Sequence, residues 1–139
     1  MREILFRGKR IDNGEWIYGM PWIFKDKSCI CPWNEGMCKY DTGYYPVEVI
    51  PETVGQYTGL TDKNKTKIFE GDIVFVGKNK IPLYIEFTDS QKDSPYLSFS
   101  WNCRLPNKPL YLHRLENDSS LYEVIGNIHD NPELLEVKE

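Results

Sequence analysis

Three cysteines lie close together in the sequence and could hold a metal ion. Cys29, Cys31 and Cys38 supply three thiols over ten residues. Structural zinc sites usually carry short ligand pairs on both sides of the metal, and only one half of that pattern is present. A fourth ligand would have to come from a distant residue: Cys103, His113 or His129. Ordinary buried or loop thiols are therefore the favoured interpretation, and we expect no metal and no cofactor.

The remaining reactive residues do not form a recognisable catalytic motif. Neither histidine lies in a Gly-x-Ser-x-Gly or His-Glu-x-x-His pattern, and no glycine-rich phosphate loop occurs. Asp62, Glu70 and Asp72 are close in sequence and could form a carboxylate or magnesium site. Roles in turns and caps are the more common use of such carboxylates. We therefore expect no enzyme, and an active site of unrecognised type is the third alternative.

Aromatic residues in and beside the irregular segment 21–46 are candidates for a binding surface. Exposed rings anchor protein partners or stack on nucleic-acid bases, whereas a single ring more often packs in a core. A long irregular segment in a compact domain is usually either functional or a variable insertion. The candidate rings are Trp22, Trp33, Tyr40, Tyr44 and Tyr45.

Five lysines in two turn-rich stretches form the nearest approach to a basic patch: Lys63, Lys65, Lys67, Lys78 and Lys80. They would contact nucleic acid if the two turns lay close together in a sheet, and are otherwise ordinary solvated lysines. The formal net charge of −4 argues against broad binding to phosphate backbones. We therefore expect a protein partner or a second copy of the chain, with nucleic-acid binding as the alternative.

The chain carries no recognisable export or membrane signal. The apolar run Ile4-Leu5-Phe6 is shorter than the roughly 7 to 15 residues of a secretory signal. No segment approaches the roughly 18 apolar residues that begin to suggest a membrane span. We therefore expect a cytoplasmic protein with no membrane partner and with reduced cysteines.

The elements that position these residues are predicted to be strands. The sequence has no alanine, the best helix former, while 14% of its residues are aromatic. Residues 3–9 and 15–20 flank Asp12-Asn13-Gly14, and an Asn-Gly pair between two such runs predicts a β-hairpin with a type I′ turn. The chain is therefore expected to open with an N-terminal hairpin.

Short branched or aromatic runs continue along the chain with turn residues between them. The predicted strands are residues 47–50, 54–58, 68–69, 73–76, 81–88, 96–101, 110–115 and 121–125. This spacing is typical of a barrel-like or sandwich-like fold. Asn131 and Pro132 predict the cap and first position of a short C-terminal helix. The length of 139 residues predicts a single, mainly β domain over 1–139.

Glu70, Gly71 and Asp72 predict a sharp structural turn before one of these strands. Gly71 can adopt a positive φ, and the Asp72 carboxylate can accept hydrogen bonds from nearby backbone N–H groups. A turn of this kind followed by a branched strand resembles the beginning of a strand in SH3-like small barrels.

Three blocks of sequence resemble the YopX family of small bacteriophage and prophage proteins. They read REILFRGKRIDNGEWIYG near the start, IPETVGQYTGLTDKNKTKIFEGDIV over 50–74 and YEVIGNIHDNPELL over 122–135. The resemblance implies a phage or prophage origin, a β-rich single domain and no established biochemical activity, and it supplies no catalytic residues. Members of the family tend to have an Asn-Gly turn where this chain has Asn64-Lys65. That departure bears on how tight the turn is.

Overall fold

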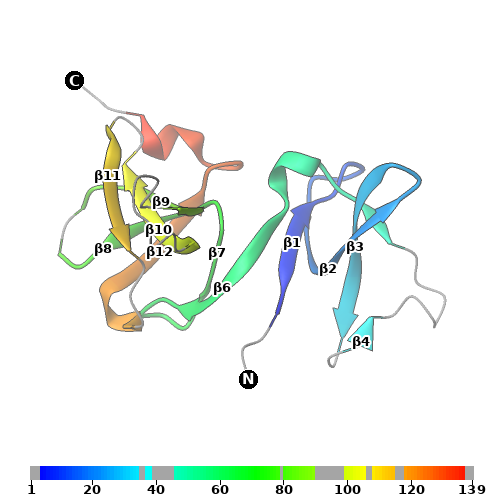
Figure 1. The fold of residues 1–139 in the computed structure, drawn as a ribbon, viewed down its shortest axis with the longest axis horizontal. Helices are drawn as coiled ribbons and strands as arrows, with labels where there is room; N and C mark the ends of the chain where they lie inside the picture. Colours follow the sequence, from blue (N-terminus) through cyan, green and yellow to red (C-terminus); the bar gives the residue numbers. More distant parts are fainter. Residues whose placement is uncertain are drawn as a thin grey trace. The chain divides into compact units, whose positions relative to one another are not determined.

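The computed structural model describes residues 4–34, 37–38, 46–78, 80–89, 99–105, 108–114 and 118–136. Its internal contacts divide the chain into two compact units, Met1–Tyr57 and Thr58–Glu139. The length of 139 residues predicts a single domain, but a length carries no information about how the contacts within a chain are divided between units. The two units contain antiparallel sheets and short 3-10 turns (Figure 1), so the mainly β class is confirmed.

The first unit contains the strands β1 (Phe6–Lys9), β2 (Trp16–Phe24), β3 (Lys27–Asn34), β4 (Met37–Cys38) and β5 (Val47–Glu48). They pair in the order β4-β3-β2-β1, with β5 also beside β3. After the 3-10 turn η2 (Pro51–Thr53), the start of β6 (Gly55–Thr61) pairs with β1. Figure 1 shows β1, β2 and β3 side by side.

The N-terminal hairpin is confirmed, but the predicted type I′ turn is wrong. A type I′ turn requires a positive φ at both central residues, and at this turn only Gly14 has one, at 73°. The Asn13 side chain instead accepts a hydrogen bond from the Glu15 amide at 2.9 Å, while the Gly14 amide donates to the Arg10 carbonyl. The side chain of Asn13 therefore closes a longer turn in which glycine alone is left-handed.

The prediction of an irregular segment over 21–46 is wrong for the part that the structure describes. Strand β2 continues through Pro21 to Phe24, and β3 follows after only two residues. Lys25 and Asp26 have φ values of 50° and 64°, so both central residues of this hairpin are left-handed. The right-handed twist of the strands favours this backbone, and Asp tolerates it better than most residues. The turn was missed because it has no glycine.

Pro21 lies within β2, and its place in the sheet accommodates it. Pairing of β1 with β2 ends at Phe6 and Gly19, so Pro21 lies beyond the last β1 partner. A proline without a backbone donor is tolerated in a strand where one side has no ladder to complete. Strand β2 therefore continues past the proline with β3 as its partner.

The core of the first unit forms where β5 and the following residues return across the N-terminal hairpin. Leu5, Ile30, Val49 and Tyr57 are buried there. A Cβ atom placed on Gly8 would lie only 3.0 Å from the Cβ of Val49, so glycine allows the two backbones to approach closely. The Tyr57 amide donates to the Leu5 carbonyl at 2.8 Å and fixes the start of β6 against the same core.

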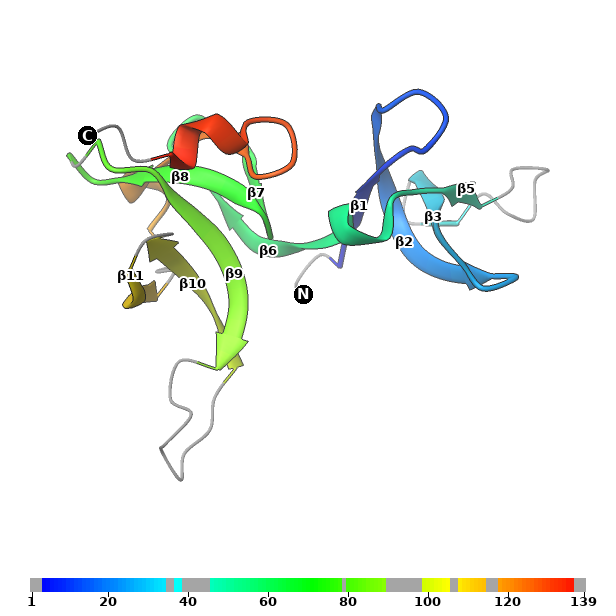
Figure 2. The ribbon, with the colours of Figure 1, turned by 90° about the horizontal axis from the view of Figure 1, so that it is seen from above.

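The second unit contains the end of β6 and the strands β7 (Lys67–Phe69), β8 (Asp72–Val76), β9 (Leu83–Asp89), β10 (Phe99–Leu105), β11 (Lys108–Arg114) and β12 (Tyr122–Asn127). The end of β6 pairs with β7, and the other strands form a sheet in the order β11-β10-β9-β8-β12. The 3-10 turn η3 (Ser119–Leu121) precedes β12. Figure 2 shows β9 as a long curved strand between β8 and β10.

One apolar cluster holds the second unit together. Trp101 and Leu105 pack against it from β10. They share one face of that strand with Cys103, as the alternation of residues 96–101 predicts for a half-buried strand. The buried members of the cluster are Ile68, Val74, Leu83, Ile85, Cys103 and Tyr122.

The predicted C-terminal helix is a single 3-10 turn, η4 (Pro132–Leu135), and the described residues contain no α-helix. Pro132 occupies the first position, as predicted. The Asn131 side chain does not cap this turn; its Oδ1 accepts a hydrogen bond from the Asn127 amide at 3.3 Å. None of the helical segments that the structure describes has the length and hydrophobicity of a membrane span.

Candidate functional site

A row of aromatic side chains lies along one face of β2. Trp16, Tyr18 and Trp22 occupy alternate positions, and alternate residues of a strand point to the same face. Tyr18 is 46% exposed and Trp22 is 43% exposed. The opposite face of the strand includes the buried Gly19 and the exposed Ile23. The rings therefore share one face of β2, and we call Trp16, Tyr18 and Trp22 the aromatic row.

A buried cation supports one end of the aromatic row. The Arg7 guanidinium lies 4.6 Å from the centre of the Trp16 ring, and Arg7 pairs with Tyr18 across β1 and β2. A planar guanidinium over an indole is an attractive cation–π pair, and Arg7 is almost completely buried. Lys9 pairs with Trp16 in the same register, so both cations lie on the face that carries the rings.

The tip of the β2–β3 hairpin adds an exposed aliphatic residue and a mixed pair of charges. Ile23 is 72% exposed, next to the left-handed turn at Lys25 and Asp26. The Lys27 ammonium lies 3.7 Å from a carboxylate oxygen of Glu48 on β5. The tip therefore combines apolar surface with charges of both signs.

The cysteines do not assemble as a zinc site in the part of the chain that the structure describes. Cys29 and Cys31 are both buried on β3, and no three His, Cys, Asp or Glu residues among the described ones could hold a metal ion. Cys29 and Cys103 are free thiols, whereas Cys31 is disulfide-bonded. The expectation that all cysteines are reduced is wrong for Cys31. That expectation was based on the cellular compartment alone, which does not show which cysteines the fold brings close to each other. Cys38 lies in β4, and its side chain is outside the description.

Burial changes the acidity of both free thiols. Loss of hydration raises the pKa of Cys29, with a further contribution from the nearby Glu48 carboxylate. The same effect raises the pKa of Cys103 to about 12. A thiol with a raised pKa has little thiolate at neutral pH, so neither residue is suited to nucleophilic or redox chemistry.

The predicted interaction residues are only partly described. Trp22 lies in the aromatic row, and Trp33 lies in β3 with its side chain outside the description. Tyr40, Tyr44 and Tyr45 are outside the described residues. The prediction did not include Tyr18, although the alternation along 16–22 was the signal that groups Trp16, Tyr18 and Trp22 on one face.

The predicted turn at Glu70, Gly71 and Asp72 is confirmed in detail. Gly71 has a φ of 90°, and the Asp72 carboxylate accepts a hydrogen bond from the Phe69 amide at 2.7 Å. The Gly71 amide donates to Ile85 on β9, and the Gly71 carbonyl accepts from Ile128. This turn therefore ties β7, β9 and the end of β12 together and has a structural role.

Asp62 also has a structural role and is 2% exposed. Its Oδ1 accepts hydrogen bonds from the amides of Asn64 and Thr66, at 2.9 and 2.8 Å. Its Oδ2 accepts from the Val124 amide at 2.9 Å, on a strand sixty-two residues away. Because Asp62 and Asp72 are committed to backbone amides, neither presents a carboxylate for the magnesium site considered from the sequence.

The five lysines of the predicted patch all lie in the second unit. Lys63 forms an ion pair with Glu123 of β12 at 2.9 Å, and this hydrogen-bonded contact lowers the pKa of Glu123. The charge of Lys80 lowers it further, and the Lys80 ammonium also lies 5.2 Å from the centre of the Phe75 ring. The charges of Lys63 and Lys80 thus both act on one residue of β12, Glu123. Lys65, Lys67 and Lys78 are exposed on the adjoining turns and at the start of β7.

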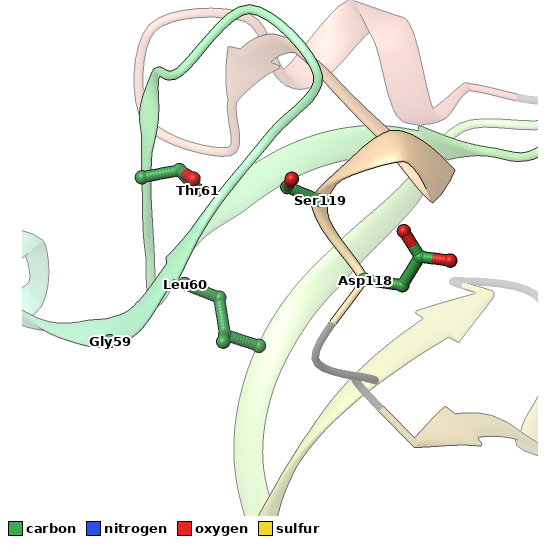
Figure 3. Close-up of a pocket in the computed structure, with 5 residues that line it drawn as sticks. All are labelled: Gly59, Leu60, Thr61, Asp118 and Ser119. Atoms are coloured by element: carbon green, nitrogen blue, oxygen red, sulfur yellow. The ribbon is translucent and has the colours of Figure 1, made fainter.

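A polar pocket of about 290 Å³ adjoins these lysines. It lies where the end of β6 faces the start of η3 (Figure 3). The Asp118 carboxylate accepts hydrogen bonds from the amide and the hydroxyl of Ser120, at 3.1 and 2.6 Å. The lining residues are Gly59, Leu60, Thr61, Asp118 and Ser119. No local pattern predicts this pocket, because its two walls are far apart in the chain.

Comparisons with known proteins identify a fold and a family. The chain is similar to the crystal structure of protein EF1440 from Enterococcus faecalis, with 24% sequence identity and a TM-score of 0.51. The match covers 98% of this chain and 100% of that chain, and it supports the fold alone. No match is found among curated proteins. The family model described as YopX protein matches residues 5–136, nearly the whole length. The chain therefore belongs to the YopX family.

Proposed function

We propose that the protein is a non-catalytic module that binds another protein, or a second copy of itself, through the aromatic row and the adjacent hairpin tip. The observation that supports this most directly is the exposure of Tyr18 and Trp22 on one face of β2, with Ile23 exposed on the other face at the adjacent hairpin tip. Tyr and Trp are enriched at protein interfaces, where each buries a large area at a low cost in side-chain entropy.

The geometry of the row favours a protein partner over a small molecule. The rings project from a paired strand, so their spacing is fixed by the sheet and little ordering is needed on binding. The polar pocket with Asp118 and Ser119 lies in the other unit. A rigid and partly apolar surface is typical of protein interfaces.

The proposal includes a cellular setting. The family supports a phage or prophage origin, and we propose the cytoplasm of the bacterial host as the place where the protein acts. In that setting the protein would act on a component of the phage or of its host, and catalysis has no part in the proposal.

The finer fold of the second unit belongs to the proposal as well. Strands β8 to β11 form a meander, the 3-10 turn η3 follows, and β12 returns to pair with β8. A meander whose last strand returns beside its first is the connectivity of SH3-like small barrels. This connectivity supports an SH3-like barrel, which agrees with the resemblance of the Glu70-Gly71-Asp72 turn.

The test combines solution mass with partner capture. The full-length protein is measured by sedimentation across a hundredfold range of concentration and is also used to capture proteins from host lysate. We expect a concentration-dependent dimer or a specifically retained protein. Tyr18→Ser and Trp22→Ser should each weaken that association at least about tenfold, as truncation of an interface anchor does.

The matched control is Ile11→Ser. Ile11 is 52% exposed in the same unit but lies in the β1–β2 turn, away from the aromatic row. It should leave association unchanged. A protein that stays monomeric and retains nothing from lysate would refute the proposal, as would equal losses in the Ile11 and Trp22 variants.

A further inference from the structure

The turn that follows β6 presents its lysines from a rigid backbone. Asp62 accepts hydrogen bonds from the amides of Asn64 and Thr66, and the Lys65 amide donates to the Asp62 carbonyl at 3.0 Å. The Asp62 amide donates to the Thr66 carbonyl and closes the turn. The side chains of Lys63, Lys65 and the following lysines therefore leave a backbone that is already ordered.

Lys65 occupies this turn in a conformation that lysine disfavours. Its φ is 65°, in the left-handed region where glycine, asparagine and aspartate are the usual residues. It is exposed, and the described residues supply no hydrogen bond or ion pair to its ammonium. Its side chain therefore makes no interaction with the described residues that would offset the cost of the strained backbone. Strained residues of this kind concentrate where the side chain has another use.

The two lysine-bearing segments lie on opposite sides of β12. The Lys63 amide donates to the Tyr122 carbonyl at 2.9 Å. The Gly77 amide, next to Lys78, donates to the Leu121 carbonyl at 2.6 Å. Neighbouring strands are about 4.8 Å apart, so the two segments lie about 10 Å from each other across the strand. The fold thus gathers lysines that are more than ten residues apart in sequence.

The local charge of this surface is opposite to that of the chain. Five lysines lie on the two segments, and the carboxylate shown to interact with them is Glu123, which contacts Lys63 and feels the charge of Lys80, whereas the whole chain has a net charge of −4. Asp62 is buried and hydrogen-bonded to amides. The exposed part of the surface is therefore cationic.

We propose that this surface, from the turn at Lys63–Lys67 across β12 to Lys78 and Lys80, binds the phosphate backbone of single-stranded nucleic acid. Spaced lysines on a rigid turn neutralise phosphates without needing to be ordered on binding. The pocket at the end of β6, lined by Leu60, Thr61 and Ser119 together with the Asp118 carboxylate, suits an unpaired base and not a paired one. The surface lies in a different unit from the aromatic row, so the two activities are separable.

Binding of the full-length protein to a fluorescent 20-mer of oligothymidine at low salt tests the proposal. The key variant is Lys65→Gly, which removes the charge and relieves the left-handed strain. It should raise the midpoint of thermal unfolding by a few degrees and weaken binding about three- to tenfold. The slope of log affinity against log salt should become shallower by about 0.7. Higher stability with unchanged affinity would overturn the proposal.

Two matched variants distinguish charge from structure. Lys65→Arg keeps the charge and the strain, and should bind within about twofold of the natural protein because phosphate contact needs only the cation. Glu123→Gln removes the competing carboxylate beside Lys63 and should tighten binding. If Lys65→Arg binds as weakly as Lys65→Gly, or if Glu123→Gln has no effect, the lysines do not contact the phosphates.

Other ligands separate the alternatives. A 20-residue oligoglutamate peptide carries a comparable charge without phosphates or bases, and a duplex of the same length has no unpaired bases. We expect both to bind at least about tenfold more weakly than the single strand. Equal binding of the peptide would indicate an acidic protein ligand and overturn the proposal, and equal binding of the duplex would overturn the assignment to single strands. Trp22→Ser should leave oligothymidine binding unchanged.

Discussion

The two units use their large side chains differently. Among the described residues, the large apolar side chains exposed in the first unit are Ile4, Ile11, Tyr18, Trp22, Ile23 and Ile50. In the second unit they are only Ile81 and Phe87, while a single apolar cluster and the buried carboxylates of Asp62 and Asp72 hold the strands and turns. The first unit thus presents apolar surface outward, and the second presents charge from a rigid framework. A candidate binding surface can be recognised by the large apolar side chains that it exposes, and a supporting framework by the apolar and carboxylate side chains that it buries.

Removal of a core side chain should produce the largest effect and should show how far the second unit depends on its apolar cluster. Ile85 is buried in β9 and pairs with Cys103 of β10. Ile85→Ala should lower the free energy of unfolding by about 2–5 kcal/mol, measured by urea denaturation, because it loses buried area and leaves a cavity. Ile81→Ala, at an exposed site just before the same strand, should cost less than about 0.5 kcal/mol. Similar losses in both variants would contradict the contrast between cluster and surface.

Removal of the Asp62 carboxylate should have the next largest effect. Asp62→Ala leaves the amides of Asn64, Thr66 and Val124 without their acceptor and should destabilise the protein by about 2–4 kcal/mol. Asp62→Asn retains one acceptor oxygen, so its stability should lie between that of the natural protein and that of Asp62→Ala. Exchange of the Val124 amide with deuterium, followed by NMR, should accelerate in the alanine variant. Unchanged exchange would show that β12 does not depend on this carboxylate.

The buried thiol of Cys103 should make stability depend on pH under alkaline conditions. Burial raises its pKa to about 12, above its ordinary value of 9.0. The unfolded chain therefore releases this proton between pH 9 and 12 while the folded protein keeps it. Stability from this group is complete below about pH 9 and falls above it, by about 1.4 kcal/mol per pH unit. Urea denaturation at a series of pH values should show a shallower alkaline loss in Cys103→Ala. Parallel curves for the two proteins would show that Cys103 is accessible to water.

The smallest effect on stability is expected at the exposed hairpin tip. Ile23 is 72% exposed, so Ile23→Ser should change the free energy of unfolding by less than about 0.5 kcal/mol. The same variant should still reduce association through the aromatic row, because an apolar residue beside an interface excludes water from it. A loss of stability comparable to that of Ile85→Ala would mean that the tip belongs to the core and not to a binding surface.

The strands were predictable where local chemistry alone decides them. The Gly71 and Asp72 turn is specified by one glycine and one short carboxylate. The strand predicted over 81–88 begins at Leu83, just after Pro82, because proline has no backbone donor for the ladder. The β2–β3 hairpin was missed because Lys25-Asp26 is a left-handed pair without glycine. Its stability comes from the strands on either side, which a local pattern does not include.

The candidate sites were less predictable because they depend on pairing between distant segments. The grouping of Lys63 with Lys80 requires β12 between them, and the pocket brings Leu60 beside Ser119. The aromatic row was readable as a single face from the alternation of Trp16 and Tyr18, but only the structure shows that Tyr18 and Trp22 are exposed on it. Periodicity reveals that residues share a face without revealing which face is covered.

The contact between Gly8 and Val49 limits which sequences can adopt the first unit. Even the smallest added side chain at position 8 would press on Val49, which lies in the segment that crosses back over the opening hairpin. In a saturation library selected for folded protein, position 8 should therefore admit almost nothing but glycine, while its neighbour Lys9 accepts many residues. A compensating exchange of Val49 for glycine, which removes its Cβ, should widen the choice at position 8, and the pair should vary together among functional clones.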